Sequence, residues 1–223
     1  MAKAAGTDRV SHPIFARFYA RMSPQMDRGG MAGHRRRLLD GLTGEVIEVG
    51  AGNGLNFTHY PSQVTRVLAV EPDPHLRGLA ERQAARAAVP IEVVSGVADR
   101  LPADIATFDA AVVSLVLCSV PDQRRALAEL HRVLRPGGRL RFLEHVRAET
   151  PALRRVQRML DATIWPVLGA GCHASRDTAA TIRAANFTIE TLDRFRFPET
   201  RVATHTSPHI LGTASRRDTG DGG

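Results

Sequence analysis

A short apolar run that ends in three closely spaced glycines constrains this chain more than any other stretch. Residues 45–49 read Glu-Val-Ile-Glu-Val and are followed by Gly50, Gly52 and Gly54. An apolar run of this length, bounded by glycine, predicts a buried strand of a parallel sheet. The glycines allow a sharp turn and a close approach of the backbone to a ligand, because no Cβ intervenes. We expect residues 55–60 to begin a helix whose free N–H groups face that ligand, so the turn predicts a nucleotide-like binding site.

The spacing of the glycines distinguishes between the known types of nucleotide-binding loop. The dinucleotide fingerprint is Gly-x-Gly-x-x-Gly, but Leu55 stands where its third glycine would be. No Lys-Ser or Lys-Thr pair follows the glycines, which excludes a phosphate-binding P-loop. The order present is Glu-x-Gly-x-Gly-x-Gly, with Glu48 two residues ahead of the first glycine.

This order resembles the first motif of class I S-adenosylmethionine (SAM) methyltransferases. SAM carries an amino-acid tail, whose carboxylate the glycine N–H groups can meet and whose ammonium group Glu48 can hold. Residues 134–138, Leu-Arg-Pro-Gly-Gly, are similar to a later signature of the same family. The resemblance spans residues 44–214 and is nearest to the ubiquinone/menaquinone-biosynthesis-like (type 11) group. Several stretches, among them residues 115–120 and 169–172, resemble methyltransferase-like enzymes that methylate alkyl thiols.

The alternation of apolar runs with helical patterns predicts an α/β fold. Strands are expected at residues 45–49, 66–70, 91–94, 108–120 and 139–144, and helices at 75–88, 121–134, 151–165 and 178–185. Such alternation predicts a parallel sheet with helices on both faces. The resemblance implies that residues 187–193 and 209–214 form a closing hairpin. The expected fold class is a Rossmann-like sheet of seven mostly parallel strands, with the last strand antiparallel.

The chain divides into three expected parts. Residues 1–42 form an N-terminal helical segment that serves either as a lid or as a packing helix, residues 43–214 form the SAM-binding domain, and residues 215–223 form a disordered tail.

An acid and a loop complete the expected cofactor site. Glu71 follows the second expected strand, where two carboxylate oxygens can accept hydrogen bonds from a ribose diol. In the family an Asp faces the adenine amino group, but Val97 stands at that position here. Asp99, or the backbone of Val97 and Ala98, can supply the contact instead. The expected cofactor-binding residues are Glu48, Gly50, Ala51, Gly52, Gly54, Asn56, Glu71, Pro72, Val97, Ala98, Leu115 and Val116.

Methyl transfer from SAM is mainly a matter of alignment, so the chain needs no nucleophile of its own. A thiol acceptor must lose its proton, because the thiolate is the nucleophile. His145 is the first candidate for the base, with Asp99 or His173 as alternatives. Leu117, Cys118 and Cys172 are the expected substrate residues. Cys118 also fits a small buried hydrophobe, whereas we expect Cys172 to be exposed because it lies in a Gly-x-Gly-Cys-His loop.

Composition narrows the classes of partner. The net charge is +7, but it comes mostly from dispersed arginines and aromatic residues are few, so a nucleic-acid partner is not expected. No apolar run reaches the length of about 18 residues, so no membrane-spanning helix is expected. Two cysteines at this spacing predict neither a disulfide framework nor a zinc motif, and no metal is expected. We expect a cytoplasmic protein whose partner is a small-molecule methyl acceptor, while the oligomeric state stays open.

The expected function is SAM-dependent methylation of a small molecule, with a thiol among the acceptors. One alternative is C- or O-methylation of a quinone-like or phenolic metabolite. Another is a SAM-binding module without transfer activity, which the departure at Val97 suggests. Methylation of nucleic-acid bases is a fourth and weaker alternative, because the fourth expected strand does not end in an Asn/Asp-Pro-Pro-Tyr type motif.

Overall fold

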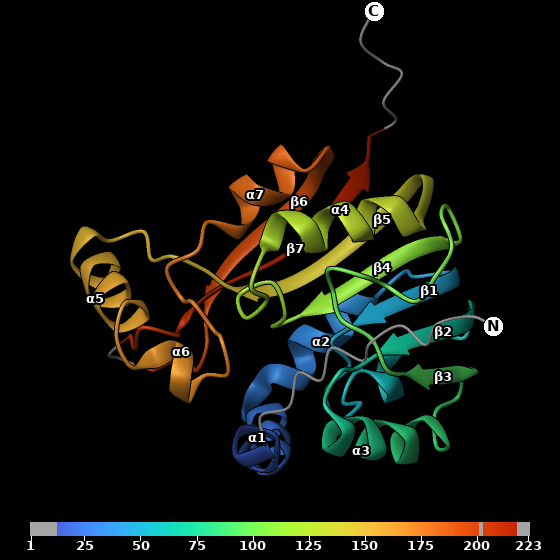
Figure 1. Ribbon diagram of the computed structural model, residues 1–223, viewed down its shortest axis with the longest axis horizontal. Coiled ribbons are helices and arrows are strands. Elements are labelled where there is room, and N and C mark those ends of the chain that lie inside the picture. The colour runs from blue at the N-terminus through green and yellow to red at the C-terminus, as the bar shows by residue number, and fades with distance from the viewer. Residues whose placement is uncertain (1–12, 201–202, 218–223) are drawn as a thin grey trace, which may run out of the picture.

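The computed structural model describes residues 13–200 and 203–217. Within them one seven-stranded sheet has the order β3-β2-β1-β4-β5-β7-β6 (Figure 1). Strands β1 to β5 pair in parallel, and β7 runs antiparallel to both of its neighbours, which confirms the expected fold class. The strands are β1 (Gly44–Val49), β2 (Val64–Val70), β3 (Ile91–Val94), β4 (Phe108–Ser114), β5 (Leu134–His145), β6 (Phe187–Arg196) and β7 (Pro208–Arg216).

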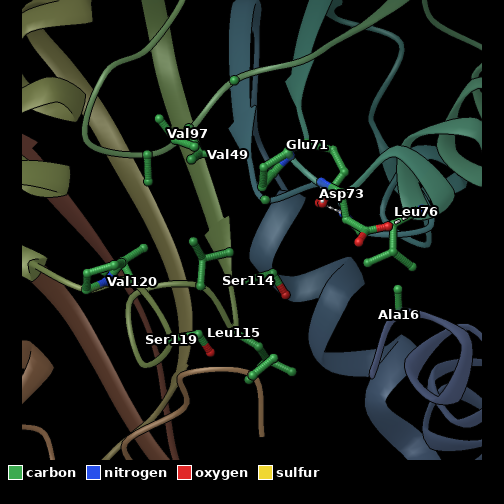
Figure 2. Close-up of a pocket in the computed structure, with 18 of the residues that line it drawn as sticks. Ala16, Val49, Glu71, Asp73, Leu76, Val97, Ser114, Leu115, Ser119 and Val120 are labelled. Atoms are coloured by element: carbon green, nitrogen blue, oxygen red, sulfur yellow. Dashed lines mark hydrogen bonds between the residues drawn. The ribbon is translucent and has the colours of Figure 1, made fainter. Parts of the chain in front are cut away.

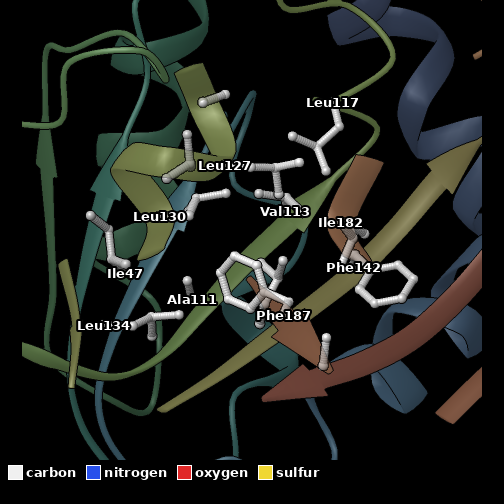
Figure 3. Packing of buried hydrophobic residues seen from close by; sticks show 14 of the residues in the cluster. Ile47, Ala111, Val113, Leu117, Leu127, Leu130, Leu134, Phe142, Ile182 and Phe187 are labelled. Atoms are coloured by element: carbon white, nitrogen blue, oxygen red, sulfur yellow. The ribbon is translucent and has the colours of Figure 1, made fainter. Parts of the chain in front are cut away.

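Helices cover both faces of this sheet and bury two separate cores. The α-helices are α1 (Pro13–Met26), α2 (Ala32–Leu39), α3 (Pro74–Ala84), α4 (Gln123–Val133), α5 (Pro151–Asp161), α6 (Trp165–Leu168) and α7 (Thr178–Ala184). Helices α4 and α7 pack on one face, where Leu130 and Ile182 meet Val113 and Phe142 (Figure 3). Helices α2 and α3 pack on the other face. Successive strand residues point to opposite faces, so each central strand contributes to both cores.

Helix α4 shows how the sequence produces this packing. Its buried residues Ala126, Leu127, Leu130 and Val133 recur at helical spacing on one side. The Asp122 carboxylate caps the helix by accepting hydrogen bonds from the backbone N–H groups of residues 124 and 125. Full burial of each leucine stabilises the fold by about 1.5–3 kcal/mol, so this stripe holds α4 against β4 and β5.

Several boundaries differ from the sequence-based expectation. The expectation of a helix at residues 55–60 is wrong, because this stretch forms only one 3₁₀ turn, Phe57–His59. The Phe57 ring is buried in the core. The strand expected to reach residue 120 ends at Ser114, since Leu115 has a φ of 61° that turns the chain out of the sheet. The helix expected at residues 151–165 ends at Asp161, and a separate short helix, α6, begins at Trp165. Ser215 and Arg216 extend β7, and residues 218–223 of the expected tail lie outside the described residues.

The described part of the N-terminal segment is helical and is interrupted near Gly29 and Gly30. A π-helical turn, Asp27–Met31, joins α1 to α2, and Gly30 has a φ of 117° within it. Figure 1 shows α1 and α2 on the side of the sheet that also carries α3. The expected residues 1–12 of this segment lie outside the described residues. Over the part of the chain that the structure describes, no helix combines the length and apolarity needed to cross a bilayer.

Candidate functional site

A cavity of about 390 Å³ opens at the carboxyl ends of β1, β2 and β4. Ligands of open α/β sheets bind at such ends, where the strand order reverses, as it does here between β1 and β4. Figure 2 shows Glu71 and Asp73 on one side of this cavity, with Leu115 and Ser119 on another. The lining includes these predicted site residues: Gly50, Gly52, Glu71, Pro72, Val97, Ala98, Asp99, Leu115 and Val116.

The first two glycines of the motif line the cavity, and the third does not. Gly50 has a φ of 72°, and a Cβ there would lie 2.4 Å from a methyl carbon of Val116. Gly52 has a φ of 58°, and its Cβ would lie 3.3 Å from the Tyr19 ring. Gly54 instead faces the Phe57 ring, 2.9 Å from where its Cβ would be. The third glycine therefore serves packing, and its expected contact with the cofactor is absent from the lining.

Glu71 presents both carboxylate oxygens at the floor of the cavity. One accepts a hydrogen bond from the Gly52 backbone N–H at 2.8 Å, and the other accepts from the Asp73 N–H at 2.9 Å. Burial raises the pKa of this carboxyl, and the two N–H groups oppose that rise. Each oxygen keeps a lone pair for a further donor. The arrangement therefore suits two adjacent hydroxyl groups of a ribose.

Glu48 lies behind the cavity rather than in its lining. Its oxygens accept hydrogen bonds from the Asn56 amide at 2.8 Å and the Tyr60 hydroxyl at 2.7 Å. Burial raises the pKa of Glu48 to about 7. The Asn56 oxygen in turn accepts from Arg35 at 3.0 Å, and the same guanidinium nitrogen reaches the Ser114 hydroxyl at 3.3 Å. Since Ser114 lines the cavity, this network positions the wall, and Ala51 likewise lies behind it.

A second buried acid, Glu144 on β5, holds the loop that leaves β4. One of its oxygens accepts hydrogen bonds from the N–H groups of Val116 and Leu117 at 2.9 Å, and the other accepts from Cys118 at 3.1 Å. Burial raises the pKa of Glu144 to about 7. The loop is thereby fixed with Leu115 and Val116 toward the cavity, whereas the expected substrate residues Leu117 and Cys118 are buried outside the lining.

His145 lies beside the two cysteine thiols and does not line the cavity. Its Nδ1 lies 3.7 Å from the sulfur of Cys118 and 3.7 Å from that of Cys172, and none of the three residues is in the lining. The expectation that Cys172 is exposed is wrong, because only 5% of its surface is accessible. The alternative base His173 is bound locally, with its Nδ1 2.7 Å from the Gly171 carbonyl oxygen. Asp99, in contrast, reaches the cavity beside Val97 and Ala98.

Part of the cavity lining was not predicted from the sequence. Helix α1 contributes Tyr19 and two neighbours, and Asp73 caps α3 by accepting from the N–H groups of residues 75 and 76. Asp73 had a sequence signal, since an Asp before a proline-initiated helix is a typical N-cap. Val49, Gly96 and Ser114 are sequence neighbours of predicted residues, whereas only the tertiary structure places Ala170 at the cavity. The missed lining residues are Phe15, Ala16, Tyr19, Val49, Asp73, Leu76, Gly96, Ser114, Ser119, Val120, Pro121, Asp122 and Ala170.

The residues present fit SAM. The free lone pairs of Glu71 suit a ribose, and Gly50 and Gly52 expose backbone where a Cβ would intrude. Leu115, Val116 and Val120 form an apolar wall, and Tyr19 covers the glycine turn. An adenosyl group with an amino-acid tail needs this combination of a diol acceptor, open backbone and apolar sides.

Known proteins agree with this geometry. Residues 47–142 match the family model described as a methyltransferase domain. Thiol S-methyltransferase TMT1B of Mus musculus is 39% identical over 182 residues, 79% of this chain and 73% of that protein. The ubiquinone/menaquinone biosynthesis C-methyltransferase UbiE of Methylobacterium nodulans is 36% identical, covering 73% of this chain and 60% of that protein.

The fold agrees as well. A geranyl diphosphate methyltransferase in complex with SAM superposes with a TM-score of 0.66 at 16% identity, over 89% of this chain and 90% of that one. Order of motifs, fold, cavity and relatives lead to one conclusion: the chain belongs to the class I SAM-dependent methyltransferases and uses SAM as its cofactor.

Proposed function

We propose that this methyltransferase transfers the methyl group to the sulfur of a small thiol. The observation that carries the proposal is the similarity to thiol S-methyltransferase TMT1B, at 39% identity over 79% of the chain. The apolar wall at Leu115, Val116 and Val120 supports it, because such a wall suits an acceptor without charged groups.

SAM supplies a methyl group that is already activated by its sulfonium. The chain's own residues then bind, orient and exclude water. Glu71 holds the ribose, and Asp99 beside Val97 binds the adenine amino group in place of the family's usual Asp. The N–H groups of Gly50 and Gly52 already donate to the Val70 carbonyl and to Glu71, so these glycines leave space for the amino-acid tail rather than making the expected donation to its carboxylate. Holding two reactants in line in this way contributes about 7–11 kcal/mol to lowering the barrier.

We also propose that α1 acts as a lid. Tyr19 packs against Gly52, and Phe15 and Ala16 from the same helix line the cavity. A lid of this kind would shield the reacting sulfur atoms from water. Both cysteines are free thiols, which supports a reducing compartment, the cytoplasm, as the place of the reaction.

A competition of acceptors tests the proposed function. Transfer of labelled methyl groups from SAM is measured with an alkyl thiol, the alcohol of the same carbon skeleton, and a demethylated quinone precursor. We expect the thiol to be methylated at least tenfold faster than either of the other acceptors. The alcohol is the matched control, because it differs only in the attacking atom.

Two outcomes would contradict the proposal. Methylation of the quinone precursor without thiol methylation would favour C-methyl transfer, which the similarity to UbiE supports as the second candidate. Tight SAM binding with no transfer to any acceptor would indicate a non-catalytic module.

A further inference from the structure

Cys118, His145 and Cys172 form a compact cluster next to the cavity. They come from three segments: the loop after β4, the end of β5 and the loop after α6. Their side-chain ligand atoms all lie within 4.8 Å of one another. Both thiols are deeply buried, with 1% and 5% of their surface accessible, and His145 is half-buried.

The distances in this cluster suit a shared metal ion. A tetrahedral zinc site has Zn–S distances of ~2.3 Å and Zn–N distances of ~2.0–2.1 Å, which places ligand sulfur and nitrogen atoms about 3.6 Å apart. Both sulfur atoms lie 3.7 Å from the same nitrogen, His145 Nδ1. Hydrogen bonding explains only one of these contacts well, because one ring nitrogen has either one hydrogen or one lone pair to offer. An ion between the three atoms would satisfy all of them.

The surroundings of the cluster point to a ligand as well. The Nε2 atoms of His205 and His209 are buried without a hydrogen-bond partner among the described residues. The His209 ring lies 4.5 Å from the His145 ring, and a Cβ on Gly169 would touch both Cys172 and Trp165. Buried polar atoms are normally paired, so these two imidazole nitrogens indicate a polar partner that the described side chains do not supply.

The cluster adjoins the wall of the cavity. The sulfur of Cys118 lies 3.5 Å from the hydroxyl oxygen of Ser119, which is a lining residue. Ala170, two residues before Cys172, also lines the cavity, and Gly171 packs closely against the Ser119 carbonyl. In Figure 2, Ser119 lies beside Leu115, away from Glu71 and Asp73. The side of the cavity opposite the ribose acceptor is therefore the side of the cluster.

We propose that Cys118, His145 and Cys172 bind a thiophilic divalent metal ion, with Zn²⁺ as the expected occupant, and that the acceptor thiol takes its fourth position. Three protein ligands with one open position are the pattern of catalytic rather than structural zinc. The inference rests on the proposed thiol methylation and deepens it. A metal ion would generate the acceptor thiolate, whereas the described residues that line the cavity include no imidazole that could remove the thiol proton.

The chemical step balances without an oxidant. The acceptor's S–H bond breaks, its proton passes to water, and the electron pair stays on the sulfur that binds the metal. That sulfur then forms a bond to the methyl carbon while the carbon–sulfonium bond breaks, and its electron pair stays on the departing thioether sulfur. The methylated product is a neutral thioether, a weaker metal ligand than the thiolate, and it leaves.

Metal binding is measured first without reference to activity. The full chain is stripped with a chelator under reducing conditions and titrated with Zn²⁺ against a chromophoric competitor, and in parallel loaded with Co²⁺. We expect one ion per chain, a sulfur-to-cobalt charge-transfer band, and a shift of that band when an alkyl thiol is added. Cys118→Ser, Cys172→Ser and His145→Gln should each weaken zinc binding by at least 100-fold, whereas the control His59→Gln should not.

Activity and cofactor binding then separate the inference from the proposed function. Stripping the metal should abolish thiol methylation, Zn²⁺ should restore it, and the affinity for SAM should not change. A reduced chain that takes up no Zn²⁺, or whose cobalt spectrum lacks the thiolate band, overturns the inference. Full thiol methylation by the stripped chain also overturns it and leaves the proposed function standing. Zinc uptake without any thiol methylation refutes the proposed function instead.

Discussion

Replacing Gly50 by alanine tests whether the glycine turn and the loop after β4 form one binding surface. A Cβ at residue 50 would lie 2.4 Å from Val116 Cγ2, well inside the ~3.5–4.0 Å of normal carbon contacts. Valine is stiff at χ1, and Glu144 holds the Val116 backbone N–H, so this methyl group cannot simply rotate away. The substitution therefore forces the two walls of the cavity apart.

The magnitude follows from two separate costs. A side chain at a φ of 72° costs about 1–2 kcal/mol, and overpacking against Val116 costs a further ~1–3 kcal/mol. Gly41→Ala is the matched control, because Gly41 has a φ of 69° and nothing within 4 Å of its Cβ position. We expect Gly50→Ala to lower the free energy of unfolding by about 2–5 kcal/mol and Gly41→Ala by only ~1–2 kcal/mol.

Urea denaturation measures the two unfolding free energies, and calorimetric titration measures SAM binding. We expect Gly50→Ala to weaken SAM binding by at least tenfold, because Gly50 and Val116 both line the cavity, and Gly41→Ala to leave it unchanged. Adding Val116→Ala to Gly50→Ala should recover the overpacking cost of ~1–3 kcal/mol, because the overlapping methyl groups are removed, and leave the backbone cost of about 1–2 kcal/mol. Equal destabilisation by the two glycine substitutions, with no recovery in the double variant, would refute the reasoning.

Three further predictions concern Glu71, α1 and the buried acids. Glu71→Gln should raise the Kd for SAM about 10- to 100-fold in calorimetry, since a hydrogen bond to a charged group contributes ~1.5–3 kcal/mol, while the exposed control Glu92→Gln should not change it. Tyr19→Ala should raise the same Kd several-fold, because the ring covers Gly52. Phe18→Ala on the same helix, where 58% of the residue's surface is accessible, should have no effect. Burial raises the pKa of Glu48 from 4.5 to about 7, so the folded chain holds this proton more tightly than the unfolded chain. The stabilisation is complete below pH 4.5 and lost as pH rises through 7; Glu48→Gln should flatten this loss in denaturation curves between pH 5 and 8, and an unchanged slope would contradict the assignment.

Local patterns were sufficient for the sheet and for the acid and glycines that face the ligand. The apolar run bounded by glycine predicts β1, and an acid at the end of an apolar strand predicts Glu71, because both signals lie within a few neighbouring residues. The same reasoning assigned Glu48 and Gly54 to the ligand, where the structure shows a buried hydrogen-bonding acid and a packing glycine. Sequence spacing alone does not distinguish a residue that faces a cavity from one directly behind it.

The sequence by itself determined the class of fold, the turn at Gly50 and Gly52, and the acid at Glu71, since each depends on neighbouring residues along the chain. The tertiary structure alone decided that Tyr19 covers the glycine turn, that Glu144 holds the loop after β4, and that Cys118, His145 and Cys172 meet. These contacts join segments far apart in the chain, and no local pattern records them. They are set by strand order and by how helices pack against the sheet, which are properties of the whole fold.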